Sequence, residues 1–182
     1  MITDSYFLST LPRRFIDDGM GEAIKYGCIS DEALFCSIAS GQIGRDEIIR
    51  RCVKIKAGIV EADEREGGLR MILNYGHTFG HAVEKLGGFK RFSHGESVGI
   101  GMLCAAKLGD KLGYPPVYGR IKSALEAVGL PTVMDYPISE LVRAAGSDKK
   151  RSGDDISVVL LDGIGKAVVK KLPISALAEL IT

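Results

Sequence analysis

Residues 69–88, LRMILNYGHTFGHAVEKLGG, are the stretch that decides the fold, because they predict a half-buried helix with an unusual polar face. The polar residues of this stretch recur at i, i+4, i+7 and i+11, namely Arg70, Asn74, His77 and His81. At about 100° per residue, these four positions fall within roughly 60° of arc on a continuous helix. A solvated helix face is normally built from Lys, Glu and Gln, so this face indicates a function beyond solvation.

The segments on either side of this stretch also carry mostly helical patterns. Upstream, we expect a helix beginning near Thr10 and Pro12, a second after Ser30, and a third over about residues 46–60. Directly downstream, SHGE (93–96) predicts a capping box with Ser93 at the N-cap and Glu96 at N3. The remaining helical segments are VYGRIKSALEAVGLP (117–131), ISELVRAAG (138–146) and ISALAELI (174–181).

One segment, ISVVLLDGIGKAVVKKL (156–172), predicts strands instead, and the Asp162-Gly163 pair with Gly165 favours a hairpin turn within it. The 182 residues show no internal repeat, low-complexity tract or long linker, so residues 1–182 are expected to form one domain. We therefore predict a mainly α fold, a multi-helical domain with one small β-hairpin near the C-terminus.

The composition narrows the class of protein. Hydrophobic residues make up 46% and charged residues 26% of the chain, which is typical of a globular domain. A net charge of +1 favours neither nucleic acid nor a membrane surface as partner. No apolar run reaches a transmembrane length, and the N-terminus lacks a signal-peptide pattern. The four cysteines are widely spaced without a CxxC pair, which favours reduced thiols and a cytoplasmic location.

All three histidines of the chain, His77, His81 and His94, lie within residues 77–94. A lone histidine on a mixed helix is most often a packing residue, but this clustering favours a metal site. His94 begins the second helix, where the dipole disfavours the protonated imidazole, and a metal ligand must be neutral. The Gly-rich turn LGGFKRF (86–92) would fold that helix back onto the first. We therefore predict a site for zinc or a similar ion; HTFGH lacks the glutamate of HExxH, which argues against a zinc peptidase.

A site of this kind usually includes one carboxylate. The candidates in the sequence are Glu22, Asp63, Glu64, Glu66, Glu84 and Glu96. Glu96 is expected in the capping box, and the three acidic residues at 63–66 lie in a charged loop that is typical of a solvated run. Glu22 lies among small and apolar residues in GMGEAIKYG (19–27), with Lys25 three positions on, so the spacing favours it modestly.

Basic residues surround this predicted site. Arg70 and Asn74 extend the polar face away from the histidines, and Lys25 and Lys56 lie on neighbouring predicted helices. Each cation alone is more often a solvated surface group, but their convergence suggests an anionic substrate, a phosphate or a carboxylate. The residues by themselves thus predict a helical metal site with an anion pocket and leave the substrate open.

Three blocks resemble the 3-dehydroquinate synthase family of sugar-phosphate cyclases: GMGEAIKYG (19–27), KAGIVEADEREGGLRMILNYGHTFGHAVE (56–84) and SHGESVGIGM (93–102). TLPRRF (10–15) and DKK (148–150) also fit, so the resemblance covers essentially the whole chain. It implies the second step of the shikimate pathway, the conversion of 3-deoxy-D-arabino-heptulosonate 7-phosphate to 3-dehydroquinate and phosphate. In that family a tightly held NAD transiently oxidises one hydroxyl, phosphate is eliminated, the carbonyl is reduced, and the ring opens and recloses by aldol addition.

The resemblance also implies roles for individual residues. Zn²⁺ or Co²⁺ would be held by Glu22, His77 and His94. His81 would be a substrate contact and proton-transfer group near the leaving phosphate. The other expected contacts are the catalytic Lys25 and Lys56 and the substrate-binding Arg70, Asn74 and one of Lys149 and Lys150.

The family has an N-terminal α/β domain that binds NAD, and this chain shows neither a βαβ run nor a GxGxxG motif. MITDSYFLSTLP (1–12) resembles the passage between the two domains. We therefore expect an isolated C-terminal domain that is inactive alone. Its partners would be the missing NAD domain and a phosphorylated sugar-acid substrate, and the full-length form would be a homo-oligomer.

Three alternatives stay open at this point. The first is another sugar-phosphate cyclase, such as a deoxy-inosose or valiolone-forming synthase, although Asn74 and His81 suit dehydroquinate synthase better. The second is the helical domain of a metal-dependent glycerol or alcohol dehydrogenase. The third is a non-catalytic helical module that binds a metal.

Overall fold

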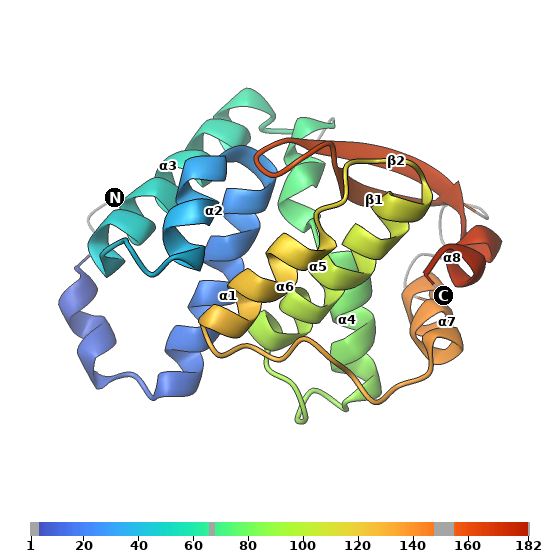
Figure 1. The fold of residues 1–182 in the computed structure, drawn as a ribbon, viewed down its shortest axis with the longest axis horizontal. Helices are drawn as coiled ribbons and strands as arrows, with labels where there is room; N and C mark the ends of the chain where they lie inside the picture. Colours follow the sequence, from blue (N-terminus) through green and yellow to red (C-terminus); the bar gives the residue numbers. More distant parts are fainter. Residues whose placement is uncertain (1–3, 66–67, 148–154, 182) are drawn as a thin grey trace.

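The computed structural model describes residues 4–65, 68–147 and 155–181. These ranges are mainly helical with one two-stranded hairpin, which confirms the predicted fold class (Figure 1). The helical elements are η1 (Ser5–Thr10), α1 (Arg13–Ser30), α2 (Glu32–Ala39), α3 (Arg45–Ala62), η2 (Leu69–Asn74), α4 (His77–Leu86), α5 (His94–Lys111), α6 (Tyr118–Ala127), α7 (Ile138–Ser147) and α8 (Ile174–Ile181). The strands are β1 (Asp155–Leu161) and β2 (Ala167–Pro173).

Helix α5 is the central element of the fold. It contacts α1, α4, α6, α8 and β1, and its residues from Gly95 to Gly109 are almost all buried. Glycine and alanine make up much of this helix, and small residues let neighbouring backbones approach closely. In Figure 1, α4 and α6 run beside α5 through the middle of the molecule.

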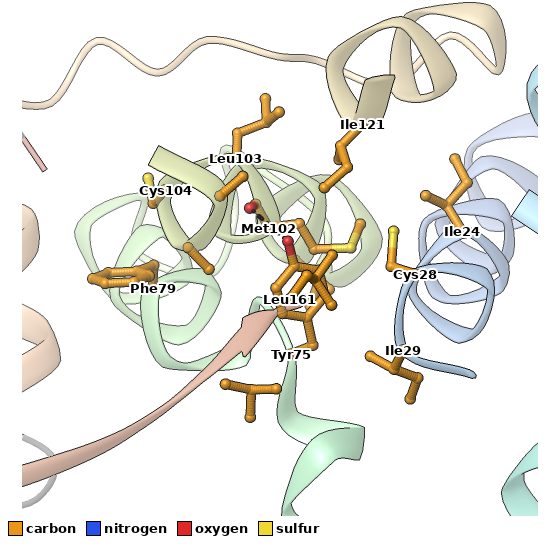
Figure 2. Close-up of a cluster of buried hydrophobic side chains, with 14 of the residues drawn as sticks. Ile24, Cys28, Ile29, Tyr75, Phe79, Met102, Leu103, Cys104, Ile121 and Leu161 are labelled. Carbon is orange, nitrogen blue, oxygen red and sulfur yellow. Dashed lines mark hydrogen bonds between the residues drawn. The ribbon is translucent and has the colours of Figure 1, made fainter. Parts of the chain in front are cut away.

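The hydrophobic core gathers side chains from elements that are far apart in the sequence (Figure 2). Ile24 and Cys28 come from α1, Ile121 from α6 and Leu161 from β1. Among them lies Tyr75, which is fully buried. Its hydroxyl donates a hydrogen bond to the backbone carbonyl of Met102 at 3.2 Å. This hydrogen bond satisfies a polar group that would otherwise be costly to bury.

The hairpin is confirmed at the predicted place. Strands β1 and β2 pair antiparallel in a register that runs from Asp155 opposite Pro173 to Leu161 opposite Ala167. Gly163 and Gly165 adopt left-handed φ values of 99° and 87° in the turn, a conformation that favours glycine. β1 is the more buried strand, and it packs against α5 and η2. The hairpin therefore lies beside η2, the element that carries Arg70 and Asn74.

The prediction of one continuous helix from Leu69 is wrong. A 3₁₀ helix, η2, ends at Asn74. Tyr75 then leaves the helical region with φ of −55° and ψ of 128°, Gly76 is left-handed with φ of 80°, and α4 begins at His77. Tight packing against α5 accounts for the break, since a Cβ built on Gly101 would lie 2.0 Å from the carbonyl oxygen of Gly76. Burial of the Tyr75 ring and this close backbone contact outweigh the helical periodicity of the sequence.

The predicted helix starts are mostly confirmed. Pro12 is the N-cap of α1, and Ser93 and Glu96 form the expected capping box at the start of α5. Helix α2 begins after Ser30, as expected, and its N-cap is Asp31, whose Oδ1 accepts from the backbone N–H of Leu34 at 3.0 Å. None of the helices in the described ranges is both long and apolar enough to cross a bilayer.

Candidate metal centre

Three helices each bring one potential metal ligand to the same point. Glu22 lies within α1, His77 is the first residue of α4, and His94 is the first residue of α5. Their ligand atoms all lie within 4.8 Å of one another, and Oε1 of Glu22 is 3.7 Å from Nε2 of each histidine. Zinc bonds to nitrogen and oxygen are about 2.0–2.2 Å long. The distances between the ligand atoms here are therefore slightly longer than the distances between ligand atoms around a tetrahedral zinc ion.

Glycines at the crossing of α1 and α5 account for the approach of Glu22 to His94. A Cβ on Gly95 would lie 2.4 Å from the carbonyl oxygen of Asp18, and one on Gly21 would lie 2.8 Å from that of Gly95. Asp18 also fixes the crossing, because its Oδ1 accepts hydrogen bonds from the Ser93 hydroxyl and, at 2.9 Å, from the Gly95 amide. Gly21 and Gly95 therefore let the two ligand-bearing segments lie in backbone contact.

Hydrogen bonds on the far side of each imidazole ring orient the two histidines. Nδ1 of His77 lies 3.2 Å from the carbonyl oxygen of Tyr75, and Nδ1 of His94 lies 3.0 Å from Oε1 of Glu84. A carbonyl or an ionised carboxylate can only accept, so Nδ1 carries the proton in both rings. In the neutral form of each ring, Nε2 then has a free lone pair on the side that faces Glu22, as a metal ligand requires.

The electrostatic setting of the cluster suits a cation. Burial lowers the pKa of His77 to about 4, and the nearby charge of Lys25 acts in the same direction, so this imidazole is neutral at physiological pH. Oε1 of Glu22 is buried and finds no hydrogen-bond donor among the described residues. A buried carboxylate oxygen without a donor costs free energy, and Lys25 meets only the other oxygen of this carboxylate, so Oε1 together with the facing imidazole nitrogens fits a divalent ion.

Lys25 lies directly behind the cluster. Its side chain is buried, and Nζ donates to Oε2 of Glu22 at 2.6 Å. Burial lowers the pKa of Lys25; the Glu22 carboxylate opposes this shift, and the charge of Lys56 on α3 adds to it. The structure thus brings Lys25 to the predicted site. The side chain of Lys56 is exposed, and its charge acts on Lys25.

A hollow of about 180 Å³ opens beside His77. Its lining includes the predicted residues Asn74 and His81, together with Thr78 and Ser157. The His81 ring centroid lies 5.4 Å from that of His77 and 6.3 Å from that of His94. Asn74, His77 and His81 therefore line the same hollow even though the predicted helix is broken. Sequence reasoning missed Ser157, because it comes from β1, far along the chain and without any local signal.

Arg70 lies on η2 and does not line this hollow. One of its guanidinium nitrogens lies 3.4 Å from the carbonyl oxygen of Glu64, and its backbone amide donates to Asp63 at 2.9 Å. Its predicted contact with the substrate stays a prediction. Lys149 and Lys150 lie outside the described residues.

The other candidate carboxylates have different environments. Asp63 accepts backbone hydrogen bonds at the start of η2, Glu64 is exposed, and Glu96 serves the capping box; Glu66 lies outside the described residues. The contact of Glu84 with His94 was not predicted from the sequence, although a signal was present. Glu84 stands seven residues after His77 and three after His81, so it continues the polar face of α4.

Comparison with known proteins places these residues in context. A family model described as 3-dehydroquinate synthase C-terminal matches residues 19–151. A 3-dehydroquinate synthase of Geobacter metallireducens is 42% identical over 183 residues, which covers 94% of this chain and 51% of that protein. One from Thermoanaerobacter pseudethanolicus is 44% identical over 177 residues, covering 91% of this chain and 50% of that protein. The chain thus spans about half the length of the curated relatives it matches.

Solved structures share the fold. The 2-epi-5-epi-valiolone synthase of Streptomyces hygroscopicus, with NAD⁺ and Zn²⁺ bound, superposes with a TM-score of 0.84 at 24% identity, over 98% of this chain and 53% of that one. A 2-deoxy-scyllo-inosose synthase complexed with carbaglucose-6-phosphate, NAD⁺ and Co²⁺ gives a TM-score of 0.79 at 23% identity, over 98% and 55% of the two chains.

Proposed function

Since the chain belongs to the 3-dehydroquinate synthase family and matches its C-terminal domain, we propose that it is the metal- and substrate-binding domain of a 3-dehydroquinate synthase. The complete enzyme would convert 3-deoxy-D-arabino-heptulosonate 7-phosphate to 3-dehydroquinate and phosphate. The observation that carries the proposal is the convergence of Glu22, His77 and His94 from three helices, with an unpaired buried carboxylate oxygen at its centre.

Glu22, His77 and His94 would hold Zn²⁺ or Co²⁺, the ions named with the two solved structures above. Such an ion supplies a Lewis acid that polarises and orients hydroxyl groups of a bound sugar acid. Around it, Lys25 would keep the Glu22 carboxylate in place through the 2.6 Å hydrogen bond, with Lys56 adding positive charge toward an anionic substrate.

The hollow beside His77 is the proposed position of the substrate. Asn74 would bind substrate hydroxyls there, and His81 would hold or move a proton near the phosphate that leaves. Arg70 and one of Lys149 and Lys150 would bind the carboxylate or the phosphate, since guanidinium and ammonium groups are the usual partners of these anions.

NAD would be held mainly by an N-terminal α/β domain of the complete enzyme, because the described residues contain a single two-stranded hairpin and offer no parallel sheet for a dinucleotide. We further propose that this enzyme works in the cytoplasm. All four cysteines, each in a described segment, are free thiols, which suits a reducing compartment.

Metal analysis of the purified 182-residue chain tests the site. The parent and His81→Ala should each bind about one equivalent of Zn²⁺, whereas His77→Ala and His94→Ala should lose most of it because each removes a ligand. If both ligand variants hold zinc as well as the parent, the proposed site is wrong.

Reconstitution tests the activity. The N-terminal half of the Geobacter metallireducens enzyme, added with NAD, should allow the chain to release phosphate from the heptulosonate phosphate. A metal-loaded chain that stays inactive when fused to that half would favour a non-catalytic metal-binding module instead.

A further inference from the structure

Glu84 lies outside the ligand set but contacts one of its members. It sits on α4, with a side chain that is 15% exposed, and its Oε1 lies 3.0 Å from Nδ1 of His94. His94 itself is 48% exposed and begins α5. The contact therefore joins α4 to the most exposed of the candidate ligands.

We propose that Glu84 is a positioning residue: it fixes the tautomer and ring orientation of His94 and increases the electron-donating power of its Nε2 toward the metal. This inference rests on the proposed metal centre and assigns a function to a residue that provides no ligand atom. A carboxylate behind an imidazole ligand stabilises the proton on the far nitrogen, which leaves the near nitrogen a stronger base.

The two histidines differ in a way that supports this role. His77 is 16% exposed, and the backbone carbonyl of Tyr75 is sufficient to orient it, because little water competes for its Nδ1. His94 borders a groove of about 420 Å³ on the side of Glu84, so water can reach the ring there. A charge-assisted hydrogen bond is about twice as strong as a neutral one. His94, the more exposed of the two histidines, is the one whose Nδ1 faces a carboxylate.

The position of Glu84 on α4 also couples the two ligand-bearing helices. His77 starts this helix and Glu84 lies two turns later on the same face, so one rigid element orients its own ligand and the ligand of α5. Glu84 is not within the group of mutually close ligand atoms, because it meets His94 on the Nδ1 side of the ring, away from Glu22. A role as an alternative ligand is thus not what this geometry favours.

Cobalt titration of the 182-residue chain tests the inference, with Co²⁺ affinity and the visible d–d spectrum as readouts. Glu84→Gln removes the charge and Glu84→Ala removes the acceptor, and both should weaken Co²⁺ binding by about 10- to 100-fold, with the larger loss and a changed spectrum for alanine. Glu96→Gln is the matched control. It lies two residues from His94 in the capping box, where glutamine also serves, so its affinity and spectrum should equal those of the parent.

A second readout needs no metal. Nitrogen NMR of ¹⁵N-histidine-labelled protein at neutral pH should show the His94 proton on Nδ1 in the parent and in Glu96→Gln, and its loss from Nδ1 in Glu84→Ala. Circular dichroism of each variant establishes that it is folded.

The outcomes separate this inference from the proposed function. A parent chain that binds no Co²⁺ would refute the metal centre, and the role of Glu84 with it. Binding by the parent with unchanged affinity, spectrum and His94 tautomer in both Glu84 variants would refute only the role of Glu84.

Discussion

Replacement of Gly95 by alanine should damage the metal centre without touching a ligand. The new Cβ would lie 2.4 Å from the carbonyl oxygen of Asp18, about 1 Å closer than an ordinary nonbonded contact, and backbone atoms cannot rotate away. Helices α1 and α5 would therefore separate by up to about 1 Å at this crossing. Overpacking costs about 1–3 kcal/mol and alanine gains about 1 kcal/mol of helix propensity over glycine, so we expect a net loss of up to about 2 kcal/mol in the free energy of unfolding.

The same displacement should also weaken metal binding. Metal sites tolerate errors of about 0.2 Å in ligand distance, and Gly95 directly follows His94, so the variant should lose about tenfold or more in Co²⁺ affinity. Gly109→Ala is the matched control on the same helix. Its Cβ would meet only Cβ of Tyr114, at an ordinary 3.7 Å, so this variant should bind Co²⁺ like the parent and be as stable or up to about 1 kcal/mol more stable.

Urea unfolding in the presence of EDTA measures the stability of the metal-free protein, and Co²⁺ titration measures the site. If Gly95→Ala unfolds at the same urea concentration as Gly109→Ala and binds Co²⁺ with the parent's affinity, then the close crossing of α1 and α5 does not position the ligands.

Four further predictions concern separate parts of the molecule. His81→Ala should keep its metal but slow turnover of the complete enzyme by about 10²–10⁴-fold, the usual effect of losing an acid–base group, and an unchanged kcat would make His81 a packing residue. Arg70→Lys should weaken substrate binding in the complete enzyme by about 1.5–3 kcal/mol, because the guanidinium fork is lost; parent-like affinity in that variant means that Arg70 does not contact substrate. The 182-residue chain alone should show no tight binding of NAD in calorimetric titration, with or without zinc, and micromolar affinity would reveal a dinucleotide site within these residues. Burial raises the pKa of Asp31, but hydrogen bonds from Arg51 and from the Leu34 amide outweigh this effect and leave it below its usual range. Its ionised form therefore stabilises the fold above about pH 4, and this stabilisation is lost as the pH falls through the lowered pKa. Urea unfolding of Asp31→Asn, which keeps the cap, should therefore approach that of the parent as the pH falls below about 4.

Local patterns were enough to predict most of the elements. The capping box of Ser93 and Glu96 and the left-handed glycines of the hairpin depend on residues within a few positions of one another. Hydrogen bonds and steric limits at that range are encoded in the neighbouring residues, so their outcome can be read along the chain. The family resemblance, and not the local pattern, supplied the choice of Glu22 as the acidic member of the metal site.

The exception was the stretch around the histidines, where local periodicity predicted a helix from Leu69 and the structure breaks it at Tyr75 and Gly76. Burial of a large aromatic ring and a backbone contact with α5 decide this break, and both involve residues far along the chain. The same holds for Ser157, which reaches the hollow only because β1 packs beside η2.

The sequence by itself determined which residues have the chemistry for a metal and an anion, and which of them share a helix. Only the tertiary structure decided that Glu22 meets His77 and His94, and that Glu84 supports His94 from behind. The physical reason is that ligand geometry depends on how closely three helices approach. Their separation is set by glycine contacts and side-chain packing between distant segments, and no periodicity within a single segment contains that distance.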